Sequence, residues 1–224
     1  MHMDRRQFVK NLGLGTASLS MGSLVTASSC APSGDSSLKQ NVKEGEDGQF
    51  LFIGDDIAIA QTEYGKVQGY LLNHVYTFLG VPYGADTSGK NRFMPPQKPE
   101  PWTDVRPAVF YGNTAPQRME NRWPNNYGTF ADHWNYWDVS EDCLYLNVWT
   151  PGIADGKKRP VLVWLHGGGF TNGSGIEQDG YHGENISREG DIVFCSINHR
   201  LGPIGFSDLS GVGGEAYKDS GNVG

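Results

Sequence analysis

The chain has 224 residues, with 18 basic and 25 acidic side chains and a formal net charge of −7. This acidic balance argues against a nucleic-acid binder, which normally carries a basic surface. The 31 glycines and 12 prolines, about a fifth of the chain, exclude an all-helical bundle because both residues interrupt helices. Three cysteines are too few for a disulfide framework, and Cys143 and Cys195 lie in apolar runs where we expect small buried side chains.

Residues 1–29 have the pattern of an export signal rather than of a folded element. Arg5 and Arg6 stand near the start, and residues 11–34 carry no charge. The stretch is too weakly apolar for a good membrane-spanning helix. It resembles the signal of the bacterial twin-arginine route, which exports folded proteins. We therefore expect the mature protein outside the cytoplasm, in the periplasm.

Cys30, directly after this signal, is a candidate lipidation site. The sequence from Ala27 to Cys30, Ala-Ser-Ser-Cys, resembles a lipoprotein processing site, although Ala27 stands where Leu is preferred. Lipidation would tether the protein to a membrane. Residues 30–48 are polar and indicate a linker, so we expect the fold to occupy residues 49–224.

The first folded segment predicts a small antiparallel meander. Residues 57–61 and 66–78 have strand-like composition, with one turn expected at Tyr64-Gly65 and another near Asn73-His74.

Three later apolar runs predict the strands of an α/β sheet. They cover residues 144–149, 160–165 and 192–197, and the last two are apolar almost throughout, as in strands buried on both faces. Residues 183–189 are the one helix that the sequence suggests between them.

A run of three glycines carries the clearest chemical information. Gly167, Gly168 and Gly169 lie between His166 and Phe170, and His166 directly follows the apolar run that ends at Leu165. Without side chains, such residues can turn their backbone N–H groups toward a common point and let a substrate approach. Acyl transfer needs these donors, because negative charge develops on the carbonyl oxygen in the tetrahedral intermediate. Lipases and esterases place His-Gly-Gly-Gly after a strand for this purpose.

From about residue 61 onward, the chain resembles the N-terminal part of a type-B carboxylesterase, the α/β-hydrolase family that includes the cholinesterases. The resemblance implies an incomplete α/β-hydrolase mixed sheet with the small meander in front. Five segments occur in the family's order: residues 76–84 (YTFLGVPYG), 91–96 (NRFMPP), 141–151 (EDCLYLNVWTP), 196–202 (SINHRLG, with His199 in place of the usual Tyr) and 221–224 (GNVG).

The resemblance assigns roles to several residues. It implies that Gly168 and Gly169 are oxyanion donors and that Gly167 shapes the loop. It places Arg92 and Glu141 in a buried structural ion pair. A small-molecule ester is the implied substrate, and no cofactor or metal is implied. Arg200 falls where a second structural pair begins, and its aspartate partner is expected beyond residue 224.

The expected nucleophile is absent from the sequence. No Gly-x-Ser-x-Gly occurs, and the nearest match, residues 205–209 (GFSDL), lacks the final glycine. We therefore expect these 224 residues to be inactive alone. Without the strand that carries the serine, residues 160–165 would form an exposed apolar edge and promote aggregation. The alternative is a non-catalytic binding or adhesion protein of the same fold, or a decayed fragment.

Aromatic residues cluster between Trp123 and Trp137, where cholinesterases have a loop that lines the entrance to the site. The cluster is either an aromatic wall that contacts the substrate or the ordinary packing of a loop, and the sequence leaves both interpretations open. In the cholinesterases a disulfide that ends at the equivalent of Cys143 closes this loop, whereas here Ala115 occupies the partner position.

Overall fold

The structure is a computed structural model that describes residues 50–118 and 138–224. The proposed export signal, Cys30, the linker and the aromatic cluster at 123–137 lie outside the described residues.

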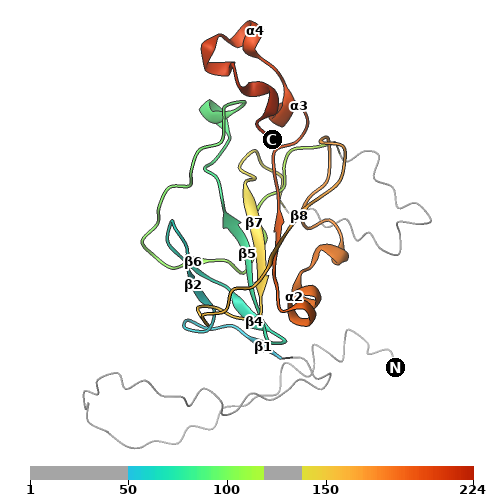
Figure 1. Cartoon of the computed structure of the whole chain (residues 1–224). Helices are drawn as coiled ribbons and strands as arrows, with labels where there is room; N and C mark the ends of the chain where they lie inside the picture. The colour runs from blue at the N-terminus through green and yellow to red at the C-terminus, as the bar shows by residue number, and fades with distance from the viewer. Residues whose placement is uncertain (1–49, 119–137) are drawn as a thin grey trace, which may run out of the picture. The chain divides into compact units, whose positions relative to one another are not determined.

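The described chain is built on a six-stranded mixed sheet (Figure 1). Neighbouring strands are antiparallel except for the last pair, which is parallel. This arrangement confirms the predicted mixed sheet of an incomplete α/β fold, and the three apolar runs form its last three strands. In spatial order the strands are β1 (Leu51–Phe52), β4 (Tyr70–Leu72), β5 (Val75–Pro82), β7 (Tyr145–Thr150), β9 (Val193–Ile197) and β8 (Val161–Leu165).

The predicted meander is divided between two sheets. A smaller sheet contains β2 (Ile59–Gln61), β3 (Lys66–Gln68) and β6 (Arg106–Pro107), whereas β4 and β5 join the main sheet. The division falls at Gly69, where a β-carbon would collide with the Thr77 carbonyl oxygen. The close approach of two chain segments at this point therefore separates β3 from β4.

Both predicted turns are present. Gln61 pairs with Lys66 across the first turn. In the second, Asn73 and His74 have φ values of 48° and 68°, and Leu72 pairs directly with Val75. Positive φ at both central residues suits the right-handed twist of the flanking strands.

Helix α2 (Glu184–Gly190) lies in the connection from β8 to β9, because parallel neighbours require a crossover. The helix predicted over 183–189 is thus confirmed within one residue. The short helices α3 (Gly202–Phe206) and α4 (Ser210–Gly213) lie beyond one end of the sheet, while α2 lies near the other end (Figure 1). Single 3-10 turns cover η1 (Gly89–Asn91), η2 (Asp179–Tyr181), η3 (Glu215–Tyr217) and η4 (Ser220–Asn222). Among the described residues, no helix has the length and apolar character needed to cross a bilayer.

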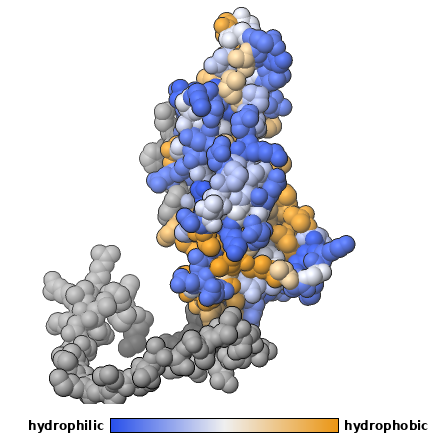
Figure 2. Space-filling model, turned by 90° about the vertical axis from the view of Figure 1, so that its left-hand side faces the viewer, coloured by the Kyte–Doolittle hydropathy of each residue, from blue (hydrophilic) through white to orange (hydrophobic). Residues whose placement is uncertain are grey.

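The buried side chains form three small clusters. The first, which includes Val67 and Phe78, lies between the two sheets; the second surrounds the fully buried Trp149. The third brings Ala115 against Cys143. From the side of the smaller sheet, apolar residues are visible at the surface among hydrophilic ones (Figure 2).

Strand β8 is exposed at the edge of the main sheet. Helix α2 packs on β5, β7 and β9, and all five residues of β8 are exposed, from 37% for Trp164 to 64% for Val161 and Leu165. The composition of this strand is typical of burial on both faces, but the described residues supply a neighbour on one side only. The predicted apolar edge is therefore present.

Candidate active site

The glycine loop borders a hollow at the carboxyl ends of β8 and β9. These strands are parallel, so their last residues, Leu165 and Ile197, meet at one edge of the sheet. The hollow has a volume of about 540 Å³, and both residues contribute to its wall. Open α/β sheets bind ligands at this kind of edge, and the volume suits a small molecule. Other lining residues include Gly167, Gly168, Gly169, His199 and Phe206.

The backbone of the loop explains its glycines. Gly168 has φ of 123° and Gly169 has φ of 61°, values that strongly favour glycine. A β-carbon at Gly168 would also collide with the carbonyl oxygen of Asn172, whereas one at Gly169 would meet nothing within 4 Å. Position 168 therefore requires glycine for two reasons, the lack of space for a β-carbon and the backbone conformation. Position 169 requires glycine for its backbone conformation alone.

The buried His166 orients the first peptide group of the loop. Its Nδ1–H donates to the Gly167 carbonyl oxygen at 2.8 Å, and because a carbonyl can only accept, Nδ1 carries the hydrogen. In a planar trans peptide the N–H points opposite to the C=O. Holding the Gly167 carbonyl therefore aims the Gly168 N–H to the other side. The His166 ring is in turn stacked on His199, with centroids 4.7 Å apart and 14° between the planes.

The second peptide group is held in the same way. The backbone N–H groups of Thr171 and Asn172 donate to the Gly168 carbonyl oxygen at 3.1 and 3.2 Å. The same planarity then aims the Gly169 N–H away from those bonds. Within residues 50–118 and 138–224, neither the Gly168 nor the Gly169 amide donates a hydrogen bond. The loop thus presents two neighbouring unpaired donors beside the hollow.

The sequence did not point to Gln117, whose side-chain amide forms two hydrogen bonds with the backbone of Gly173, a residue that follows the glycine loop in the chain. The two residues are 56 positions apart, and neither belongs to a motif that would have connected them.

The structure brings Arg92 and Glu141 together, with Nε 2.8 Å from Oε2. The pair is only partly buried, which corrects the expectation of a buried pair: the Arg92 side chain is 48% exposed and that of Glu141 is 19% exposed. Arg92 directly follows η1, a turn with no buried residue, which accounts for its exposure. The hydrogen bond to Glu141 raises the pKa of Arg92. Neither residue lines the hollow.

Arg200 is the buried cation near the site, with 1% of its surface exposed. Its Nη1 donates to the Met94 carbonyl oxygen, while Nε and Nη2 have no hydrogen-bond partner among the described residues. Burial lowers the pKa of Arg200. The described residues also contain no group of three or more His, Cys, Asp or Glu side chains placed to bind a metal ion.

Comparison with known proteins gives the family. The carboxylesterase family profile matches residues 56–224. Phenmedipham hydrolase of Pseudarthrobacter oxydans is 45% identical over 157 residues, which are 70% of this chain and 30% of that enzyme. Acetylcholinesterase of Electrophorus electricus is 38% identical over 189 residues, 78% of this chain and 29% of that enzyme.

Solved structures agree with the sequence comparison. An esterase of Clostridium hathewayi that can hydrolyse aliphatic aromatic polyesters superposes with a TM-score of 0.70 and 39% identity, covering 79% of this chain and 33% of that one. A carboxylesterase of Geobacillus stearothermophilus gives a TM-score of 0.64 and 38% identity, over 75% and 31% of the two chains. This chain spans less than a third of the length of the curated relatives it matches. With the family profile matched over most of its length and the α/β-hydrolase esterases as its structural neighbours, the chain belongs to the carboxylesterase family.

Proposed function

We propose that this chain supplies the oxyanion-binding part of a carboxylic-ester hydrolase that works by serine acyl transfer on small-molecule esters. The observation that carries the proposal is the pair of unpaired amides at Gly168 and Gly169, aimed by the bonds on the preceding carbonyls. As a serine attacks the ester carbonyl, the oxygen gains negative charge. Donors already in place stabilise that charge by about 3 kcal/mol each, because no reorganisation is needed.

The proposal locates the attacking serine and its base outside these 224 residues. No Gly-x-Ser-x-Gly occurs in them, and an oxyanion loop without an activated nucleophile performs no acyl transfer. We therefore expect the 224-residue chain to lack esterase activity by itself.

The proposal for localisation is export by the twin-arginine route through residues 1–29, followed by lipidation of Cys30. It rests on the sequence pattern alone. Mass spectrometry of the membrane fraction should find a lipid on Cys30, and Cys30→Ser should move the protein to the soluble periplasmic fraction. An unmodified Cys30 in a processed protein would contradict the lipid anchor and leave the export proposal standing.

The decisive test is hydrolysis of p-nitrophenyl butyrate by the protein expressed from its complete gene, compared with Gly169→Ala and Gly156→Ala variants. Both glycines have left-handed φ, 61° and 75°, and open space where a β-carbon would stand, so the two substitutions impose similar strain. Only Gly169 borders the hollow, and relaxation of its φ would turn the donor amide.

We expect kcat to fall about 100-fold in Gly169→Ala and to be unchanged in Gly156→Ala. Equal effects of the two substitutions on kcat would show that Gly169 has no specific role in catalysis. A folded wild type that hydrolyses no ester would favour a non-catalytic binding protein instead.

A further inference from the structure

The side chain of Gln117 pairs with the backbone of Gly173 in both directions. Its Oε1 accepts from the Gly173 N–H at 2.8 Å, and its Nε2 donates to the Gly173 carbonyl oxygen at 2.9 Å. A second bond from Nε2 reaches the Ala115 carbonyl oxygen at 3.2 Å. Two bonds to one residue set both the position and the orientation of that residue, as a neighbouring β-strand would.

Gly173 lies directly against the start of the glycine loop. It has φ of 112°, and a β-carbon there would collide with the Gly167 carbonyl oxygen and with the His166 imidazole. No space is left between these groups. The Gly167 carbonyl belongs to the same rigid peptide unit as the Gly168 N–H, so a displacement of Gly173 is transmitted to that donor.

The same displacement reaches the second donor. Asn172 precedes Gly173 in the chain, and its N–H donates to the Gly168 carbonyl oxygen, whose peptide unit contains the Gly169 N–H. Gln117 is therefore connected to both donors through backbone groups alone. It does not line the hollow beside the glycines; it lines a second hollow together with Thr171 and Asn172.

Gly173 depends on this side chain for its hydrogen bonds. Its backbone is buried, and within the described residues no other group bonds its N–H or its carbonyl. Buried backbone groups are almost always paired, because an unpaired one costs its full desolvation. Removing the amide of Gln117 would force Gly173 to move until both groups find new partners.

From these contacts we infer that Gln117 is a positioning residue for the oxyanion donors Gly168 and Gly169. The catalytic part of this inference rests on the proposed function. Because Gln117 does not line the hollow beside the glycines, its loss should weaken binding of the transition state and leave binding of the substrate unchanged.

The test compares three variants of the protein expressed from its complete gene. Gln117→Met keeps the length of the side chain and removes the amide. Gln117→Glu keeps one acceptor but replaces the donor by an oxygen that faces two carbonyls. Gln97→Met is the matched control, because Gln97 is an exposed glutamine whose Nε2 contacts the nearby Pro95 carbonyl.

For p-nitrophenyl butyrate we expect kcat to fall about 100-fold in both Gln117 variants, as for a misplacement of about 1 Å, with KM within about 2-fold of the wild type. The inhibition constant of a trifluoromethyl ketone, which forms an oxyanion at the site, should rise in parallel with the fall in kcat. Gln97→Met should match the wild type in all three quantities.

An unchanged kcat in Gln117→Met would overturn the inference, and so would a fall in kcat matched by a rise in KM. If neither Gln117 variant folds, hydrogen exchange in the wild type tests the inference. The Gly173 amide should exchange slowly, and rapid exchange would contradict a stable hydrogen bond from Gly173 to Gln117. If the wild type hydrolyses no ester, the proposed function fails separately. In that case the NMR chemical shifts of the Gly168 and Gly169 amides test whether Gln117 positions these groups. Gln117→Met must change both shifts, and Gln97→Met must leave them unchanged.

Discussion

Arg200 donates a hydrogen bond from Nη1 to the carbonyl oxygen of Met94, 106 residues earlier in the chain, at 2.8 Å. This is the one hydrogen bond of the Arg200 guanidinium among the described residues, although the residue is almost completely buried. A buried charge without an acidic partner is unfavourable, and an apolar side chain of similar volume often replaces such a group at no loss.

We therefore predict that Arg200→Met leaves the free energy of unfolding of the 224-residue chain unchanged or raises it, by up to about 4 kcal/mol. Urea denaturation followed by tryptophan fluorescence measures this quantity. A loss of about 3–5 kcal/mol would instead show that the charge of Arg200 is compensated. Arg159→Met is a useful comparison, because Arg159 pairs with two carboxylates and its replacement should destabilise the chain.

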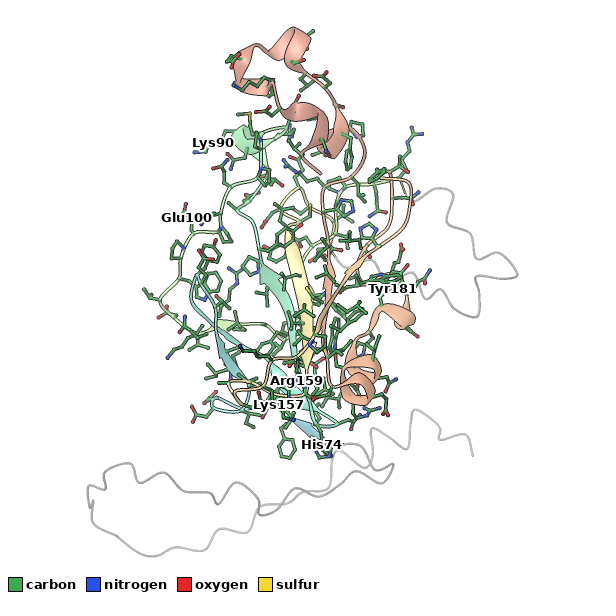
Figure 3. The ribbon with its side chains drawn as sticks, viewed as in Figure 1. His74, Lys90, Glu100, Lys157, Arg159 and Tyr181 are labelled. Carbon is green, nitrogen blue, oxygen red and sulfur yellow. The ribbon has the colours of Figure 1, made fainter. Side chains whose placement is uncertain are left out.

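Asp155 should make stability depend on pH in the acid range. Arg159, at the opposite end of the ribbon from Lys90 (Figure 3), donates to Asp155 at 3.0 and 2.7 Å. These bonds, together with the backbone N–H of Lys157, lower the pKa of Asp155 to about 2. A carboxyl whose pKa is lowered by folding stabilises the fold above its unfolded pKa of about 3.9 and loses that contribution as the pH falls toward about 2.

The stability difference between wild type and Asp155→Asn should accordingly be constant above about pH 5 and shrink between about pH 4 and pH 2. Urea midpoints at several pH values measure it. A difference of the same size at both ends of this range would mean that Asp155 acts through packing rather than through its charge.

The thiols of Cys143 and Cys195 should be inert in the folded chain. Burial raises the pKa of Cys143 to about 12 and that of Cys195 to about 11. Since the thiolate is the reactive form, iodoacetamide at about pH 8 should modify neither residue until urea unfolds the chain. Mass spectrometry of a Cys30→Ser variant gives a clear count, because only these two cysteines then remain. Modification of Cys143 under native conditions would contradict the packing of Cys143 against Ala115.

The exposed edge at β8 should promote aggregation of the 224-residue chain. Val163 is 54% exposed in the middle of this strand. A lysine there opposes strand pairing between molecules, so Val163→Lys should lower light scattering at a given protein concentration. Val212→Lys is the control, because Val212 is also exposed and apolar but lies in α4. Equal improvement by both substitutions would point to net charge rather than to the edge.

The sequence alone was enough to identify the family and the position of the glycine loop. Apolar runs between glycines and prolines gave three correct strands, and Asn73-His74 gave a correct turn, because these features depend on neighbouring residues. The loop could be located for the same reason: Gly167 to Gly169 follow the strand that ends at Leu165 after a single residue, His166.

Other features were decided by contacts between distant parts of the chain. Gly69 ends a strand because the chain passes close to Thr77, and Arg92 is exposed because it follows η1, a turn with no buried residue. The amides of Gly168 and Gly169 are free of hydrogen bonds among the described residues because other groups hold the preceding carbonyls, and Gln117 bonds the neighbouring Gly173 from 56 residues away. Local sequence sets which backbone conformations a residue can adopt. The direction of each hydrogen bond is chosen only when folding brings its partner into place.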